Sequence, residues 1–155
     1  MRALLPLTHS ALETIQNRIK SGADCSELLD PYDIKGADLA GIRCERFDRS
    51  GQDLEGANLS GAWLPNAKLM NANCRNCNFS GANLERSDGS HGDFRGANMA
   101  NIFAPFAIWR YADLRDATLN GAVIRFACEE SYGARFTKGF FELLMKHWKV
   151  EGWNA

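Results

Sequence analysis

The tetrapeptide Gly-Ala-Asn-Leu stands at residues 56–59 and again at 81–84, and Gly-Ala-Asp-Leu stands at 36–39. These copies belong to a five-residue period that keeps one register from about Tyr32 to Phe126. When the Leu position is taken as the centre of each unit, nineteen centres follow one another from Ile34 to Ile124. A period of five matches neither the 3.6 residues of a helix nor the two residues of a strand, so neither structure fits this segment.

The positions within one unit differ sharply in chemistry. The centre is apolar in every unit except those of Arg49 and Gly89, and Ala stands two residues before it in eleven units. Because residues two apart share a face of an extended chain, the large and the small apolar side chain point the same way. Asp or Asn lies between them in twelve units, and Gly or Asn follows two residues after the centre in twelve. Gly and Asn tolerate a positive φ, so each unit predicts a short straight edge followed by a corner.

This pattern, Ala-(Asp/Asn)-Leu-X-X, resembles that of the pentapeptide-repeat family over roughly 95 of the 155 residues. The resemblance implies an all-β solenoid, a right-handed quadrilateral β-helix with four units in each coil. Nineteen units would make about five coils, and at about 4.8 Å per coil they would form a rod roughly 24 Å long. One coil cannot bury its apolar edge alone, so stacking would create a continuous core.

The ends of the chain depart from the repeat, and they predict three regions: an N-terminal helical cap over 1–30, the β-helix over 31–128, and an irregular last edge with a C-terminal helical cap over 129–155. Residues 8–20 have a helical pattern in which Ser10 can act as the cap and Glu13 follows three residues later. After Ala127 the register slips by two residues, which makes 134–136 a last edge. Both helices would cover open ends of the solenoid, where backbone groups lack partners.

Composition predicts a single soluble domain, with 45% hydrophobic residues and a net charge of −1. No apolar run approaches the roughly 18 residues that a membrane span needs, and the first seven residues are too short and too quickly polar for a signal peptide. Five cysteines are an odd number. Without an export signal they indicate reduced thiols in a cytoplasmic protein.

Several outward positions break the polar rule of the repeat. They carry apolar or aromatic side chains, mostly towards the C-terminal half: Trp63, Phe103, Phe106, Ile108, Tyr111, Val123 and Phe126. An exposed apolar patch of this kind usually marks an interface. Three occupants stay open at this point: the C-terminal helix Phe140–Trp148 folded back onto the stripe, a second copy in a homodimer through the stripe or that helix, and an unidentified protein.

Two centres that break the pattern need a physical account. A buried, unpaired guanidinium is very costly, so we expect Phe47 to fill the interior while Arg49 turns outward. Gly89 leaves the core thin, but Trp109 stands one coil later on the same face. We expect the Trp109 ring to lean into the space over Gly89.

Signals for catalysis are weak. Cys74 and Cys77 have the spacing of half a zinc site, but no second pair exists, and their phase makes both of them inward-pointing core residues. Residues 87–91 place Ser, Asp and His close together, yet neighbours on an edge and its corner diverge in direction. No phosphate-binding loop, dinucleotide fingerprint or HExxH motif is present, and a filled narrow solenoid offers no obvious pocket. The sequence therefore predicts a protein that is not an enzyme and that has no cofactor and no metal.

The best known activity of the family belongs to quinolone-resistance proteins, which resemble duplex DNA and bind type II topoisomerase. A DNA mimic about 24 Å long would need on the order of 14 negative charges. Residues 32–126 contain 11 acidic and 11 basic residues, which sum to zero, and no basic stripe suggests nucleic-acid binding. The sequence thus favours a non-catalytic protein-interaction or scaffold module, with a DNA-mimic inhibitor or protector of type II topoisomerase as the alternative.

Overall fold

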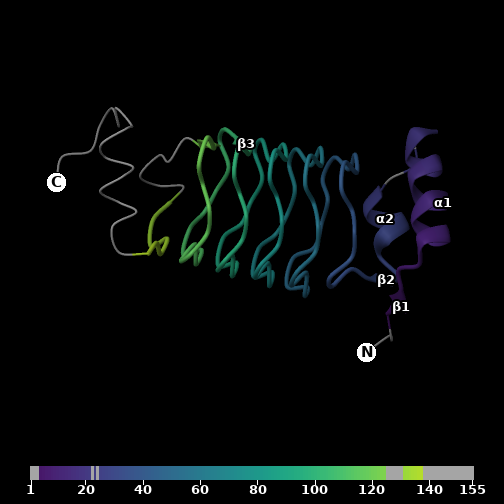
Figure 1. Cartoon of the computed structure of the whole chain (residues 1–155), viewed down its shortest axis with the longest axis horizontal. Coiled ribbons are helices and arrows are strands. Elements are labelled where there is room, and N and C mark those ends of the chain that lie inside the picture. Colours follow the sequence, from purple (N-terminus) through teal and green to yellow (C-terminus); the bar gives the residue numbers. More distant parts are fainter. Residues whose placement is uncertain (1–3, 22, 24, 125–130, 138–155) are drawn as a thin grey trace.

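The computed structural model describes residues 4–21, 23, 25–124 and 131–137. Its coils lie side by side along one axis, with the two helices and the N-terminus at one end (Figure 1). Its elements, in chain order, are β1 (Leu5–Pro6), α1 (His9–Lys20), α2 (Cys25–Leu29), β2 (Tyr32–Asp33), β3 (Phe103–Ala104) and β4 (Val123–Ile124). Neither helix in the described part of the chain has the length and apolar character to cross a membrane.

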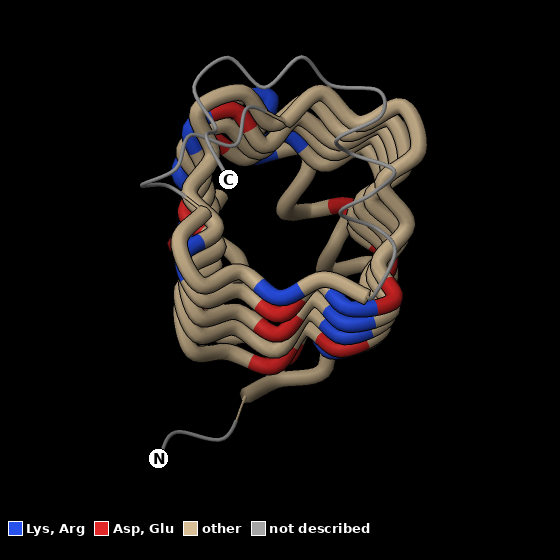
Figure 2. The backbone as a smooth tube through the Cα atoms, turned by 90° about the vertical axis from the view of Figure 1, so that its left-hand side faces the viewer, with Lys and Arg blue, Asp and Glu red and all other residues tan. Residues whose placement is uncertain are grey.

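Parallel pairing at a fixed distance along the chain builds the rod. Asp38 bridges Asn58, Asn58 bridges Asn78, and the pattern continues to Thr118 with every partner twenty residues later. Twenty residues are four units, and the backbone has a four-sided outline when it is viewed along the rod (Figure 2). Asp113 instead bridges Arg135, twenty-two residues later. This pairing confirms the predicted two-residue slip before the last edge.

The corners lie where the five-residue pattern predicts them. All eighteen described corner positions from Gly36 to Gly121 have a positive φ, including Asn66 at 58°. Gly and Asn adopt this conformation readily. Phe106 and Tyr111 adopt it as well, at 62° and 56°, although a bulky side chain makes it unfavourable.

The core is continuous and is filled by the predicted pairs of large and small side chains. Leu59 and Ala57 are both fully buried, and equivalent pairs follow in the later coils. On the outside of the same face, amide side chains form a ladder: Asn78 Nδ2 donates to Asn58 Oδ1 (3.1 Å), and Asn98 Nδ2 donates to Asn78 Oδ1 (3.2 Å). Apolar packing inside and polar ladders outside thus stack with the same period.

The predicted packing of Trp109 over Gly89 is confirmed. Trp109 is buried, with 1% of its surface exposed. A Cβ atom added at Gly89 would lie only 2.8 Å from Trp109 Cζ3. The Trp109 ring also meets Phe94 edge-on, with 5.2 Å between the ring centres. The missing side chain at Gly89 therefore makes room for the indole of the next coil.

The prediction for Arg49, in the first coil on this face, is half right. Phe47 is buried as expected, but Arg49 is also buried, with 1% exposed, so its predicted outward orientation is wrong. Arg49 Nη1 donates to the Asp48 carbonyl (2.7 Å), and Nη2 makes a long contact of 3.5 Å with the Ser26 carbonyl. Burial lowers the pKa of the guanidinium, and the charges of Asp30 and Asp48 oppose that shift. The guanidinium can stay inside because α2 lies over it and supplies a carbonyl partner.

The N-terminal helix forms where expected but has a different cap. α1 begins at His9, and the Thr8 hydroxyl accepts a hydrogen bond from the Ala11 N–H (3.2 Å). Thr8 is therefore the N-cap, and the expectation for Ser10 is wrong. Ile15 on the inner face of α1 is buried against the core. The sequence pattern did not predict α2, and the helix predicted near Phe140–Trp148 lies outside the described residues.

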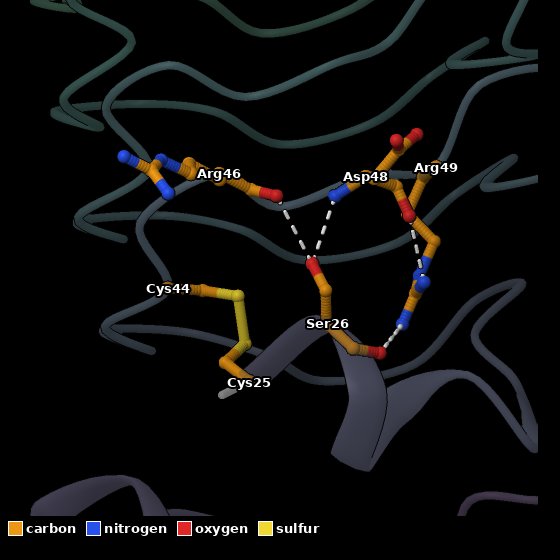
Figure 3. The surroundings of a disulfide bond; sticks show 6 residues. All are labelled: Cys25, Ser26, Cys44, Arg46, Asp48 and Arg49. Carbon is orange, nitrogen blue, oxygen red and sulfur yellow. Dashed lines mark hydrogen bonds between the residues drawn. A yellow bond between two sulfur atoms is a disulfide. The ribbon is translucent and has the colours of Figure 1, made fainter. Parts of the chain in front are cut away.

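Two cysteines form a disulfide, so the expectation that all cysteines are reduced is wrong. Cys25, the first residue of α2, bonds to Cys44 in the first coil, with 5.3 Å between their Cα atoms (Figure 3). Cys74 and Cys77 are free thiols in the core. The cytoplasmic location was inferred partly from reduced thiols, so it loses that support and stays a prediction.

Candidate interaction surface

Apolar side chains gather on two neighbouring edges of the rod and on the corners that follow them, in its C-terminal half. Phe103 (44% exposed), Phe106 (55%) and Tyr111 (49%) project from a single coil, and Ile108 between them is half-buried. Val123 is 50% exposed and pairs directly with Phe103 through β3 and β4. Phe126, which was predicted to belong to the same surface, lies outside the described residues. The structure therefore brings five of the seven predicted residues together.

Trp63 lies apart from this group. It is half-buried, and the guanidinium of Arg43 stands 5.0 Å from the centre of its ring. Trp63 bridges Asn83, which in turn bridges Phe103. A polar side chain thus separates Trp63 from the exposed group, although the repeat places all three in one column.

Sequence reasoning missed three neighbours of the exposed group. Tyr132 is 65% exposed, and its ring meets the Tyr111 ring edge-on, with 5.5 Å between the ring centres. The His91 ring stacks on the Tyr111 ring, with 4.9 Å between the ring centres. The guanidinium of Arg86 lies 5.5 Å from the Phe106 ring. Tyr132 follows the register slip, so the five-residue pattern could not assign it to a column. We call the following set the apolar corner: Phe103, Phe106, Ile108, Tyr111, Val123 and Tyr132.

Phe106 and Tyr111 share their backbone conformation with every described corner, including those of Arg46, Arg86 and His91. Phe106 and Tyr111 hold a positive φ that Gly or Asn would hold without strain. A non-Gly residue in such a region costs on the order of 1–3 kcal/mol. Two of the exposed rings of the surface therefore stand at positions where the local backbone conformation disfavours them.

A different face of the rod carries stacked rows of charge, which Figure 2 shows as adjacent red and blue rows. Arg95 Nε donates to Asp93 Oδ1 (2.8 Å), and Arg115 Nε donates to Asp113 Oδ1 (2.9 Å). Arg135 Nη1 approaches Asp113 Oδ2 at 3.7 Å. Opposite charges thus neutralise one another within the face.

Asp113 makes this face sensitive to acid. The hydrogen bond from Arg115 lowers the pKa of the Asp113 carboxyl, and the charge of Arg135 contributes. The stabilisation from ionised Asp113 is therefore present above an unfolded-state pKa of about 3.9 and is lost as pH falls through the lower folded-state pKa. We expect Asp113→Asn to lower the free energy of unfolding at pH 7 by about 1–2 kcal/mol.

Urea unfolding of wild type and Asp113→Asn at pH 7 and at stepwise lower pH would measure this effect. The difference between the two proteins should shrink below about pH 4. The exposed Glu45→Gln serves as the matched control and should track wild type throughout. A difference that stays constant down to pH 2 would show that the charge of Asp113 is not what stabilises the fold.

The residues considered for catalysis do not converge. Ser87 is buried whereas His91 is exposed at its corner. Cys77 Sγ donates to the Leu54 carbonyl (2.9 Å), and the hydrogen bond with Cys77, together with burial, raises the pKa of the Cys74 thiol. Both thiols lie in the core, as predicted. Within the ranges that the structure describes, no three His, Cys, Asp or Glu residues are placed to hold a metal ion.

A shallow hollow of about 490 Å³ lies between α1 and the first coil. Its described lining has the amine of Lys20 but no carboxylate, thiol or imidazole beside it to form a catalytic pair. The lining residues are Gln16, Ile19, Lys20, Gly41, Ile42 and Arg43.

Solved structures share this architecture. A pentapeptide repeat protein from the thylakoid lumen of Arabidopsis thaliana has 22% identity over 74% of this chain and 74% of its own, with a TM-score of 0.52. The pentapeptide repeat protein Rfr23 from the cyanobacterium Cyanothece 51142 has 19% identity over 82% of this chain and 96% of its own, with a TM-score of 0.50. At these identities the likeness concerns the fold alone.

The fluoroquinolone resistance protein QnrB1 is more distant, with 16% identity over 72% of this chain and 61% of its own, and with a TM-score of 0.24. No curated protein matches this chain in sequence. The family model for pentapeptide repeats matches residues 33–69 and 67–102 with eight copies. Those copies coincide with the four-sided coils and their corners, so this chain belongs to the pentapeptide-repeat family, whose members fold as right-handed quadrilateral β-helices.

Proposed function

We propose that this chain is a non-catalytic protein-interaction module, a rod of about five coils with helical caps, which binds another protein through the apolar corner. The observation that carries the proposal is the exposure of Phe103, Phe106 and Tyr111 on one coil, two of them on a strained backbone. Exposed apolar patches of this size on a single chain often mark interaction sites. Elsewhere the repeat places Asp or Asn at most of the outward edge positions.

The size of the apolar corner favours a short apolar segment of a different protein over a second copy. Aromatic side chains bury about 150–250 Å² each, so four rings near half exposure offer roughly 400 Å². A standard interface buries about 800 Å² on each partner, and obligate dimers bury more. The surface is thus suited to a transient contact in which the partner inserts apolar side chains between the rings.

DNA mimicry has less support. The repeat segment has no net charge, and the carboxylates of its charged face pair with arginines of the same face. A topoisomerase inhibitor of this type would present unpaired negative charge along its length. A gyrase supercoiling assay with the purified chain would test this alternative directly, and we expect no inhibition and no protection against a quinolone.

The interaction is best tested by a photo-crosslinking residue placed at Phe106, with a second placed at Asn76 on the diagonally opposite corner. A protein crosslinked from the first position only would then be purified and its Kd measured against wild type. We expect Phe106→Asp and Tyr111→Asp to weaken binding at least tenfold, because a buried carboxylate without a partner is costly. Asp tolerates the positive φ at both corners, so the rod should stay folded.

Asn76→Asp is the matched control, since it places the same charge on the same type of corner, and its Kd should equal that of wild type. An unchanged Kd for Phe106→Asp would overturn the apolar corner as the binding surface. If the crosslinked protein is a second copy of this chain, and Phe106→Asp turns a dimer into a monomer in light scattering, the partner is the chain itself and the proposed foreign partner is wrong.

A further inference from the structure

The N-terminal cap is held to the first coil by a covalent bond and by hydrogen bonds beside it. Cys25 opens α2 and is 4% exposed, while Cys44 is a buried centre of the first coil. The bond between them spans a sequence separation of 19 residues. It therefore joins α2 covalently to the first coil.

Ser26, next to the disulfide, closes the open edge of the first coil. Its hydroxyl accepts a hydrogen bond from the Asp48 N–H (2.9 Å) and donates one to the Arg46 carbonyl (3.1 Å), as Figure 3 shows. One coil later, the equivalent Lys68 N–H donates to the Phe47 carbonyl (2.8 Å). The Ser26 side chain thus replaces the carbonyl of a coil that does not exist, and it blocks an edge that could pair with another strand.

We propose that the Cys25–Cys44 disulfide is a redox-sensitive latch on this cap. Both sulfurs are buried, so a reductant reaches them only when α2 lifts from the coil, because thiol–disulfide exchange needs direct access. The intact bond in turn limits how often α2 lifts. The disulfide can therefore be reduced only while the cap is open. Once it is reduced, the cap opens more often, and each opening exposes the edge of the first coil and the guanidinium of Arg49.

The reductant is a dithiol. Its thiolate attacks one sulfur of the disulfide, the other cysteine leaves as a thiolate and takes up a proton, and a mixed disulfide forms. The second thiol of the reductant then attacks the mixed disulfide, closes a ring and releases the remaining cysteine. Two electrons and two protons pass from the dithiol to the protein, which ends with two free thiols.

Hydrogen exchange measures the latch directly. In the chain-entropy account a closed loop of about 15–20 residues shifts an opening equilibrium by on the order of 100-fold. We expect the Asp48 amide to exchange about 100-fold faster in the protein reduced by dithiothreitol than in the oxidised protein. Amides between residues 88 and 100, two or more coils away, should exchange equally in both. Equal exchange at Asp48 in the two states would overturn the latch.

The second measurement is the rate at which dithiothreitol reduces the native protein, followed by thiol titration. Ser26→Ala removes two hydrogen bonds of the cap without touching either sulfur, and we expect reduction about tenfold faster. Ser80→Ala, a half-buried serine in a distant coil, is the matched control and should leave the rate unchanged. A rate that is equal for Ser26→Ala and wild type, or a purified chain whose Cys25 and Cys44 titrate as free thiols before reduction, would overturn the proposal.

Discussion

Trp109→Ala should lower the free energy of unfolding by about 4 kcal/mol, since truncating a buried Phe or Trp costs about 3–5 kcal/mol. The Trp109 indole is 1% exposed and fills the space over Gly89 in the preceding coil. Its loss leaves a cavity that the stacked backbones cannot close, because hydrogen bonds to the coils on either side fix their spacing. Urea unfolding followed by circular dichroism would give the change.

The same contact predicts strong coupling between two positions twenty residues apart. Gly89→Leu alone should destabilise the rod by about 1–3 kcal/mol through overpacking, because a Cβ at Gly89 already comes within 2.8 Å of the Trp109 ring. In the double variant Gly89→Leu/Trp109→Ala the new Leu occupies the cavity, so the combined cost should be well below the sum. Gly89→Leu combined with Leu39→Ala, a buried centre two coils earlier on another face, is the control, and its costs should add. Additive costs for Gly89 and Trp109 would contradict the packing between coils.

The regular part of this fold is predictable because the repeat is a local code. A large and a small apolar residue two apart define the core face, and the residue two after the centre defines the corner, so Leu59, Ala57 and Asn66 are assigned without knowledge of any distant contact. Even the exception at Gly89 was predicted, since the column of Trp109 follows from the same count of twenty residues.

The sequence misled where the contact comes from outside the repeat. Whether the Arg49 side chain points inward or outward depends on α2, and the sequence of α2 has no periodic pattern. The pairing of Cys25 with Cys44 depends on a short distance between them that only the folded cap creates. At the candidate surface, column counting placed Trp63 and Phe103 in one stripe. It could not show that Asn83 separates them, nor that Tyr132 joins the surface after the register slip.

Arg49→Ala tests the strongest of these tertiary contacts, and we expect it to lower the free energy of unfolding by about 3 kcal/mol. Arg49 is among the largest fully buried side chains, so its truncation leaves a cavity between the first coil and α2. It also removes the donor of the Asp48 carbonyl and the guanidinium that stands 5.1 Å from the Phe47 ring. Thermal and urea unfolding would measure the loss, with the exposed Arg75→Ala as control.

Arg49→Leu separates the volume of the side chain from its charge. Leu is the commonest residue at the centre of this repeat, it fills most of the cavity, and it removes a desolvated guanidinium whose Nε has no partner among the described residues. Replacing a buried charge by a well-packed apolar residue is often neutral or stabilising, so we expect Arg49→Leu to lie within about 1 kcal/mol of wild type. A loss as large as that of Arg49→Ala would mean that the hydrogen bonds of the guanidinium, rather than its bulk, hold α2 against the first coil.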